Sequence, residues 1–420
     1  MQDNEKKPAL RFKGFTDPWE QRKLEEYLEV SGQKNFEGIY TKEDVLSVSG
    51  DFGIVNQIEF QGRSFAGASV ANYGVVETGD IVYTKSPLKS NPYGIIKANK
   101  GKNGIVSTLY AVYKPKQSAN PEFVQIYFEQ DARMNNYMHP LVNKGAKNDM
   151  KVSAENALKG QIVFPDIKEQ RTISEFFRNL DTLITLHQRK YEKLVNIKKS
   201  MLDKMFPKNG ASVPEIRFKG FTDPWEQRKL AELTKTITTG KSVNSDEGEV
   251  SDGDIGVLKT SCVSYDRFNP SESKPVVKSE QQLVKCAVEK DSVIVSRMNT
   301  PERVGACGYV STDFPNLFLP DRLWKLKFQD TVDTYFVYMM LVSSAYKEKI
   351  TSMASGTSGS MYNIPKETFL NLQLVIPAKI DEQKQLGKIL KKIDTLITLH
   401  QRKLEKLQNI KKSCLEKMFV

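Results

Sequence analysis

Cysteine and histidine are scarce in this chain, which has four cysteines and three histidines among its 420 residues. None of the cysteines, Cys262, Cys286, Cys307 and Cys414, belongs to a C-x-x-C pair, so the sequence predicts neither a disulfide framework nor a zinc site. We therefore expect a reducing, cytoplasmic environment, no bound metal and no catalysis that depends on several histidines.

Long apolar runs and common catalytic motifs are also missing. The longest apolar run, residues 335–342, has eight residues, whereas a membrane span needs about twenty. No apolar stretch follows the N-terminal residues, which argues against a signal peptide. The sequence has no G-x-x-x-x-G-K-[ST] phosphate loop, no H-E-x-x-H and no G-x-S-x-G. These absences favour a binding protein without catalytic residues of its own.

Basic residues outnumber acidic ones, 62 to 51, which gives a formal net charge of +11 and a sequence pI of about 9.1. Such a surplus suits a polyanion such as nucleic acid, or an acidic protein surface.

A long internal repeat is the most informative feature of the sequence. Residues 11–24 read RFKGFTDPWEQRKL, and residues 217–230 read the same. Residues 180–206 and 393–419 match at 22 of 27 positions. Between these blocks the two halves hardly resemble each other. The chain is therefore a duplication, which predicts a fused pseudo-dimer whose constant frame binds identical partners while each divergent insert reads something different.

The second repeated block is predicted to form two long helices. Apolar or semi-polar residues recur every three or four positions, without an internal proline or glycine, and Pro165 and Pro377 stand just before the blocks. A helix over residues 167–206 would be about 60 Å long, and its natural partner is its own copy in an antiparallel coiled coil. The seam residues expected to act as spacer or partner contacts are Leu180, Leu183, His187, Leu194 and Ile197, with Ile393, Leu396, His400, Leu407 and Ile410 in the second copy.

Both helices end in basic stretches. Residues 187–206 and 400–420 each contain six basic and two acidic residues. These stretches predict either a solvated coiled-coil face or a rod that lies over DNA or binds an acidic partner.

The inserts are expected to be mixed α/β domains. In the first, strands are predicted at 79–85, 104–107, 109–113 and 161–164, with a helix over 120–129. In the second, strands are predicted at 290–297, 304–310, 323–328 and 372–376, with one helix over 332–349. The fold class is therefore α+β, with two globular recognition domains joined by the helices. The expected division is 1–165 and 207–377 for the domains with their leading segments, and 166–206 and 378–420 for the helices.

Candidate DNA contacts are basic and small polar residues near predicted loops. Arginine can bond the guanine edge bidentately, whereas lysine more often holds phosphate. For any single position a solvated surface residue is the ordinary interpretation, so only the group carries weight. The candidates are Arg63, Lys85, Lys89, Lys97, Lys100, Lys102, Lys144 and Lys147 in the first insert, and Lys259, Ser261, Arg267, Arg297, Arg303, Arg322, Thr357 and Ser358 in the second.

The repeated motifs resemble those of the specificity subunit of bacterial type I restriction-modification systems. Each variable region opens with WEQRKL, at Trp19 and at Trp225. Each closes with a proline, an E-Q pair (Glu169-Gln170 and Glu382-Gln383) and then DTLI…HQRK…KLxNIKKSxLxKMF. The resemblance covers essentially the whole chain, although the inserts match only in layout.

The resemblance implies that each insert is a target-recognition domain that reads one half of a bipartite double-stranded DNA site. It implies that the helices set the gap between the half-sites and dock two methyltransferase subunits, which two ATP-dependent restriction subunits join. S-adenosylmethionine, ATP and Mg²⁺ would then be used by the partners and not by this chain, which would have no catalytic residue.

Two other functions are open on the sequence. One is a coiled-coil adaptor that binds protein but not DNA, and the other is an enzyme with an unrecognised site in the inserts. Salt-sensitive DNA binding would exclude the first, and activity of the purified chain alone would support the second.

Overall fold

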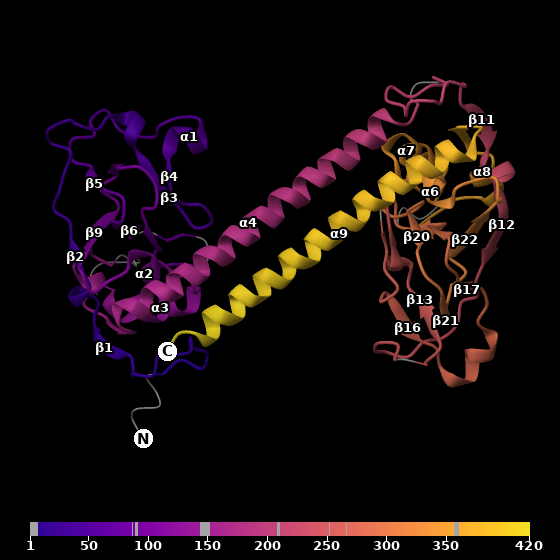
Figure 1. Ribbon diagram of the computed structural model, residues 1–420. Helices are drawn as coiled ribbons and strands as arrows, with labels where there is room; N and C mark the ends of the chain where they lie inside the picture. The colour runs from indigo at the N-terminus through magenta and orange to yellow at the C-terminus, as the bar shows by residue number, and fades with distance from the viewer. Residues whose placement is uncertain are drawn as a thin grey trace. The chain divides into compact units, whose positions relative to one another are not determined.

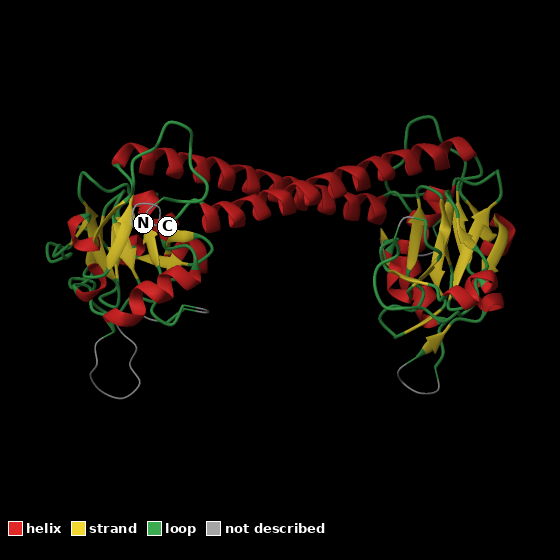
Figure 2. Ribbon diagram, turned by 90° about the horizontal axis from the view of Figure 1, so that it is seen from below, coloured by secondary structure: helices red, strands yellow, loops and turns green. Residues whose placement is uncertain are grey.

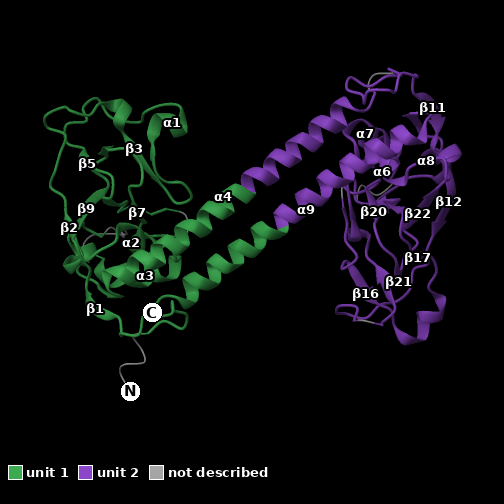
Figure 3. Cartoon of the chain, viewed as in Figure 1, with its two compact units in different colours: residues 1–187, 402–420 green, residues 188–401 purple. Residues whose placement is uncertain are grey.

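The computed structural model describes residues 7–85, 87–88, 91–142, 152–207, 211–251, 253–265, 267–356 and 361–420 (Figure 1). The chain forms two compact units (Figure 3). The first unit is Met1–His187 with Arg402–Val420, and the second is Gln188–Gln401. Each unit holds one insert, the first part of one long helix and the last part of the other. The fold class is α+β, as the sequence predicts.

The first insert is built on a four-stranded antiparallel sheet in the order β2-β9-β6-β7. Its strands are Leu28–Val30, Ala111–Pro115, Ile81–Tyr83 and Ile96–Ala98. Two antiparallel pairs accompany it, the hairpin of β3 Leu46–Ser49 with β4 Gly53–Asn56, and β5 Gly74–Val76 with β8 Gly104–Val106. The helices are α1 Gln57–Gln61, α2 Pro121–Tyr127 and α3 Asp131–Met138. Asn120 caps α2 by accepting the Phe123 N–H at 2.9 Å, which confirms the predicted helix start.

The second insert has two four-stranded sheets. One is antiparallel in the order β12-β22-β18-β20, with strands Thr234–Thr239, Leu323–Phe328, Ser292–Ser296 and Cys307–Val310. The other is mixed in the order β16-β13-β21-β17, with strands Ser273–Pro275, Gly256–Leu258, Phe314–Phe318 and Ala287–Val288. Short pairs are β14 Val263–Ser264 with β15 Arg267–Phe268, and β19 Met298–Asn299 with β23 Tyr362–Asn363. Short helices α5 Leu230–Leu233 and α8 Lys366–Leu370 complete the insert.

The single helix predicted over 332–349 is wrong, because the segment forms two helices. These are α6 Thr334–Val342 and α7 Ser344–Ser352. Ser343 between them has an extended backbone with ψ 152°, and its hydroxyl donates to the Met340 carbonyl at 2.7 Å. A serine that bonds its own backbone in this way competes with the helix and ends it.

The repeated segment at the start of each half forms a short exposed strand anchored by two buried side chains. Strand β1, Glu20–Lys23, pairs with β10, Gln161–Phe164, and β11, Glu226–Lys229, pairs in the same antiparallel register with β24, Gln373–Ile376. Trp19 and Leu24 flank β1 and are buried in the core of the first unit. Trp225 and Leu230 occupy the same places in the second.

The long helices are α4, Ile167–Lys204, and α9, Ile380–Lys417, each of 38 residues (red in Figure 2). This confirms the predicted pair of antiparallel helices. Along α4, a row of buried or half-buried side chains recurs in alternating steps of four and three, at residues 173, 177, 180, 184, 187, 191, 194, 198 and 201, and residue 205 just after the helix continues it. Along α9 the row is at residues 386, 390, 393, 397, 400, 404, 407, 411 and 414, and residue 418 just after the helix continues it. Such a heptad spacing is typical of a coiled-coil seam.

Four residues predicted to lie in the seam lie outside it. Leu183, Ile197 and Ile410 are 46, 38 and 37% exposed, and Leu396 is half-buried but off the heptad positions. The seam uses the neighbouring Ile184, Lys198, Ile397 and Lys411. The reason is the period. A heptad repeat has 3.5 residues per turn and therefore alternates steps of four and three strictly, whereas the predicted stripe used these steps without strict alternation and drifted off the seam.

The end of each long helix completes the core at the start of the other. Phe419 packs against Trp19, Phe123 and Phe177 in the first unit, with ring centroids 5.6–6.2 Å apart. Phe206 packs against Trp225 and Phe336 in the second. The burial of these aromatic rings is what holds the helix ends to the inserts.

Candidate nucleic-acid interface

A buried arginine–glutamate pair fixes the frame of each unit. The Arg11 guanidinium donates from Nε and Nη2 to the two carboxylate oxygens of Glu169, each at 2.7 Å. Arg217 and Glu382 form the same bidentate pair at 2.7 and 2.8 Å. Each pair ties the segment before the exposed strand to the first turn of a long helix. Planar bidentate pairs of this kind are geometrically specific.

The glutamine next to each glutamate joins three elements. Gln170 accepts the Asn120 N–H at 2.9 Å and donates to the Pro165 carbonyl at 2.9 Å. Gln383 accepts the Asp333 N–H at 3.0 Å and donates to the Pro377 carbonyl at 2.9 Å. Both glutamines are buried. Each therefore holds the last strand of an insert, the cap of its buried helix and a long helix in one arrangement.

A lysine stands in the seam of each helix and meets an aspartate of the other helix. Lys411 lies 2.9 Å from Asp181 in the first unit, and Lys198 lies 2.7 Å from Asp394 in the second. The two pairs occupy equivalent places in the repeat, and they fit only an antiparallel arrangement. In the second unit Asp394 also accepts the Tyr335 hydroxyl at 2.5 Å.

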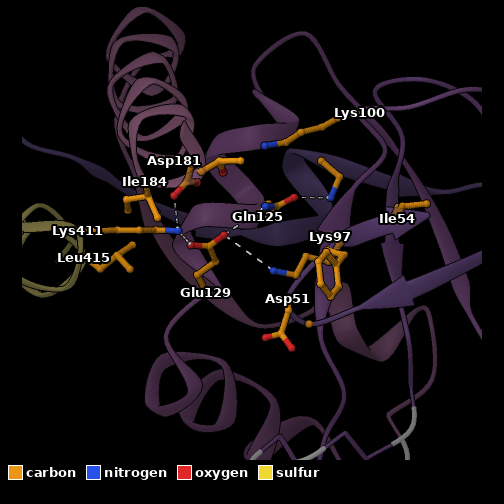
Figure 4. Close-up of a pocket in the computed structure, with 15 residues that line it drawn as sticks. Asp51, Ile54, Lys97, Lys100, Gln125, Glu129, Asp181, Ile184, Lys411 and Leu415 are labelled. Carbon is orange, nitrogen blue, oxygen red and sulfur yellow. Dashed lines mark hydrogen bonds and ion pairs between the residues drawn. The ribbon is translucent and has the colours of Figure 1, made fainter. Parts of the chain in front are cut away.

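A cavity of about 570 Å³ opens in the first unit between the β3–β4 turn, β7, α2 and the two long helices (Figure 4). Glu129 lies in it between two lysines, with Lys411 at 3.1 Å and Lys97 at 3.9 Å. Burial would raise the pKa of Glu129, but Lys411 and Lys97 outweigh it and hold that pKa below its ordinary value. Because the charges lining the cavity pair with each other, we assign it a structural role.

In the first insert, the candidate DNA contacts differ in exposure. Arg63, Lys100 and Lys102 are exposed, and the Arg63 guanidinium lies 4.5 Å from the ring centroid of Phe65. Lys97 is buried, so a phosphate would have to compete with Glu129 for it. Lys89, Lys144 and Lys147 lie outside the described residues.

Lys85 is conformationally unusual. It lies two residues after the end of β6, in the left-handed region with φ 55°, and its ammonium donates to the Thr108 carbonyl at 3.1 Å. Burial, and then the charge of Lys34, lower the pKa of Lys85. Strained positions of this kind cluster at functional sites.

In the second insert, Arg267, Arg303 and Arg322 are exposed, and Arg267 donates to Gln401 at 3.2 Å. The Lys259 ammonium lies 3.9 Å from the carboxylate of Glu272, and the Ser261 hydroxyl donates to the same carboxylate at 2.6 Å. Arg297 is half-buried and donates to the Asp321 carbonyl at 2.8 Å. Thr357 and Ser358 lie outside the described residues. A role of any of these side chains in DNA binding stays a prediction.

The residues predicted as spacer contacts divide into two groups. Leu180 is buried, His187, Leu194, Ile393, His400 and Leu407 are half-buried in the seam, and Leu396 is half-buried beside it. Leu183, Ile197 and Ile410 face solvent, as do Leu186 and Leu399. Exposed apolar side chains on a helix are candidates for contact with another protein.

Sequence reasoning noted Gln170 and Gln383 only as part of the repeated motif, and it assigned no structural role to Arg11, Gln170 or Lys198 and their second copies. The signal was present, since each is a polar residue that is identical in both halves. Among the described residues, no group of three or more His, Cys, Asp or Glu side chains could hold a metal ion. The same part of the chain contains no helix that is long and apolar enough to span a membrane.

Comparisons with known proteins agree with this architecture. The family described as the type I restriction modification DNA specificity domain matches residues 222–409. The chain is 24% identical over 258 residues to the type I restriction enzyme MjaVIII specificity subunit of Methanocaldococcus jannaschii, covering 60% of this chain and 59% of that one. It is 22% identical over 289 residues to the EcoEI specificity subunit of Escherichia coli, covering 68% and 46%. It thus spans about half the length of these relatives.

A third relative and a solved structure extend the likeness to the full length. The putative MjaX specificity subunit of Methanocaldococcus jannaschii is 23% identical over 416 residues, covering 94% of this chain and 91% of that one. The crystal structure of the type I restriction-modification S subunit from M. genitalium shares the fold with a TM-score of 0.63, at 12% identity and 99% coverage of both chains. Residues 222–409 thus match the type I restriction modification DNA specificity domain, and the chain is similar over its full length to specificity subunits of type I restriction-modification systems.

Proposed function

We propose that this chain recognises a bipartite DNA sequence for a type I restriction-modification complex, with each insert reading one half. The observation that carries the proposal is the contrast between frame and inserts. The frame keeps the same buried pairs, Arg11–Glu169 and Arg217–Glu382, in both units. The inserts differ in sequence and in sheet arrangement. Two inserts that differ from each other, held on the same repeated frame, suit a DNA target whose two halves also differ.

We further propose that the long helices set the gap between the half-sites and dock two methyltransferase subunits. Exposed apolar side chains support this role, because Leu186 and Leu399 occupy equivalent positions and both face solvent. Two restriction subunits would join the same complex. The chain would act beside DNA in the cytoplasm.

In this proposal the chain has no catalytic residue. S-adenosylmethionine, ATP and Mg²⁺ are used by the partner subunits, which methylate a flipped base or cut the DNA. This chain contributes recognition and geometry, and it directs both reactions.

The test is DNA binding by the chain purified together with its methyltransferase subunit. Affinity for a bipartite duplex should exceed that for a scrambled duplex and should fall steeply with salt, because each phosphate contact releases counterions. Scrambling either half should weaken binding. The same low affinity for all duplexes, without a dependence on salt, would support a protein-only adaptor instead.

A further inference from the structure

One sheet of each insert matches the other strand for strand, although the inserts hardly resemble each other in sequence. The order β2-β9-β6-β7 of the first insert corresponds to the order β12-β22-β18-β20 of the second, and both sheets are antiparallel. Tyr83 in β6 pairs with Ala111 in β9, and Val295 in β18 pairs with Trp324 in β22. Counting from these pairs, positions of one insert can be compared with positions of the other.

Backbone bonds on the other side of β6 and β18 agree with this match. Thr84, one residue after Tyr83, donates its N–H to the Ile95 carbonyl at 3.1 Å. Ser296, one residue after Val295, donates its N–H to the Ala306 carbonyl at 2.8 Å. Thr84 and Ser296 are both buried hydroxyl residues. The two sheets therefore share one register.

A turn leads into β9 and into β22 with the same backbone bond. We call residues 107–110 and 320–323 the matched turns. In each, the N–H of the last residue donates to the carbonyl of the first, at 2.9 Å in the first insert and 3.4 Å in the second. The register places the two turns at the same four positions.

A basic side chain from the neighbouring strand fastens each matched turn. The Lys85 ammonium donates to the Thr108 carbonyl at 3.1 Å, and Arg297 Nε donates to the Asp321 carbonyl at 2.8 Å. Lys85 and Arg297 occupy the same position in the register, and Thr108 and Asp321 are the second residues of the matched turns. Two inserts of divergent sequence thus hold one turn in one way. Such support fixes the place of the next residue, as a reading side chain requires.

The third residue of each matched turn is exposed, and it differs between the inserts. It is Leu109, 61% exposed, in the first insert and Arg322, also exposed, in the second. The Arg322 side chain forms no ion pair with any residue that the structure describes. An identical support with a different tip is the arrangement expected of two readers with different targets.

The matched turns lie at the end of each sheet that is remote from the repeated frame. The chain passes from the frame into β2 and β12, whose first residues pair with the last residues of β9 and β22 (Leu28 with Pro115, and Thr234 with Phe328). The first residues of β9 and β22, which follow the matched turns, therefore lie at the opposite end. The frame binds one end of the sheet and leaves the other end available to a ligand.

The charge near this end of the sheet suits a polyanion. Residues 81–121, which include the first matched turn, contain seven lysines and no acidic residue. Residues 25–80 contain ten acidic and three basic residues, so the basic charge of the insert is concentrated in the later segment. In the second insert the exposed Arg303 lies in the connection from β18 to β20, which leaves the sheet at the same end as the turn.

We propose that Leu109 and Arg322 are specificity-determining residues, each of which contacts a base pair in the half-site of its own insert. Arg322 contacts a guanine, because the arginine fork bonds the guanine edge bidentately, and Leu109 contacts the methyl group of a thymine. The assignment rests on the proposed function, recognition of a split DNA sequence. One shared turn with two different tips then gives two different half-sites.

The experiment changes one tip at a time in the full-length chain, purified with its methyltransferase subunit. Arg322→Leu removes the guanine contact from the second insert, and Leu109→Arg introduces one into the first. The matched controls remove or add a positive charge at the opposite end of the same sheets. They are Lys235→Leu, at the start of β12, and Gln117→Arg, just beyond β9; both residues are exposed.

The probe is a pool of DNA duplexes that carry the motif methylated by the wild-type complex, with one half-site randomised at a time. Bound duplexes are sequenced to give the base preference at each position. Unfolding curves verify that every variant folds.

Arg322→Leu should reduce the preference for guanine at one position of one half-site at least tenfold, since a bidentate contact discriminates by roughly tenfold to a hundredfold. Leu109→Arg should shift one position of the other half-site from thymine to guanine by a similar factor. The controls should keep the wild-type preferences. Preferences within twofold of wild type in both variants, or loss of binding to every duplex by a folded variant, would overturn the assignment and leave the proposed function standing. A wild-type complex that methylates no split motif would overturn both.

Discussion

The ammonium nitrogen of Lys198 lies 2.7 Å from a carboxylate oxygen of Asp394, in a seam position where a coiled coil ordinarily has an apolar residue. The counterpart, Lys411 with Asp181, occupies the same place in the other unit. A charged pair in a seam adds little net stability, because desolvation offsets the attraction. Its effect is on register: the lysine finds a carboxylate at only one alignment of the antiparallel helices.

Removing the acid should therefore cost more than removing the base. Asp394→Ala leaves the Lys198 ammonium and the Tyr335 hydroxyl without their acceptor, and should lower the free energy of unfolding by about 1–3 kcal/mol. Lys198→Met keeps an apolar stem in the seam and should cost less than about 1 kcal/mol. Urea unfolding measures both, with Lys199→Met on the exposed face as control. Equal losses for the two variants would contradict the account.

Low pH should destabilise the first unit by protonating the Glu129 carboxylate. Although burial tends to raise its pKa, Lys411 and Lys97 lower it below the ordinary value, so the folded state favours the charged carboxylate. The resulting stability is present above about pH 4.5 and is lost as the pH falls through the lowered pKa. Glu129→Gln should be less stable than wild type at neutral pH, and the difference should shrink below about pH 4. Urea midpoints across this range test it, with the exposed Glu175→Gln as control; a difference independent of pH would rule the mechanism out.

Exchanging the first insert should change one half of the DNA target. Replacement of residues 25–165 by the insert of another specificity subunit leaves the second insert and most of the frame intact. The methylated motif of the complex should then keep one half and its gap while the other half changes. A motif altered in both halves would show that the inserts do not read independently.

Lengthening the helices should widen the gap. The heptad spacing of the seam makes seven residues the unit that preserves its phase. Duplicating residues 183–189 in α4 and 396–402 in α9 adds about 10 Å to each helix. That is the rise of about three base pairs, so the unspecified gap should grow by about three. As a control, duplicating the seven residues in only one of the two helices should impair assembly. An unchanged gap would refute the role of the helices as a ruler.

The frame was predictable because its signals are local and repeated. The proline-bounded helices and the Asn120 cap follow from residue spacing alone. The seam was harder, since Leu183 and Ile184 are adjacent apolar residues and only the heptad period decides which one faces the partner helix. A lysine such as Lys198 does not look like a seam residue until its aspartate, far away in the sequence, is in place.

The sequence could predict which types of residue would form the candidate DNA interface, but not which individual side chains are exposed. Lys97 and Lys100 are three positions apart, yet one is buried beside Glu129 and the other is exposed. That difference depends on packing against α2 and α9, of which α9 comes much later in the chain. Likewise, the break at Ser343 depends on a single backbone turn inside an apolar stretch.

The central claim is that this chain selects a split DNA sequence, and a methylome tests it most directly. The chain is co-expressed with the methyltransferase subunit of the same system, in cells that lack other DNA methylation, and modified bases are mapped. The account predicts one bipartite motif with a fixed gap, absent when this chain is omitted. Methylation that is the same with and without the chain, or a motif with a single uninterrupted part, would contradict it.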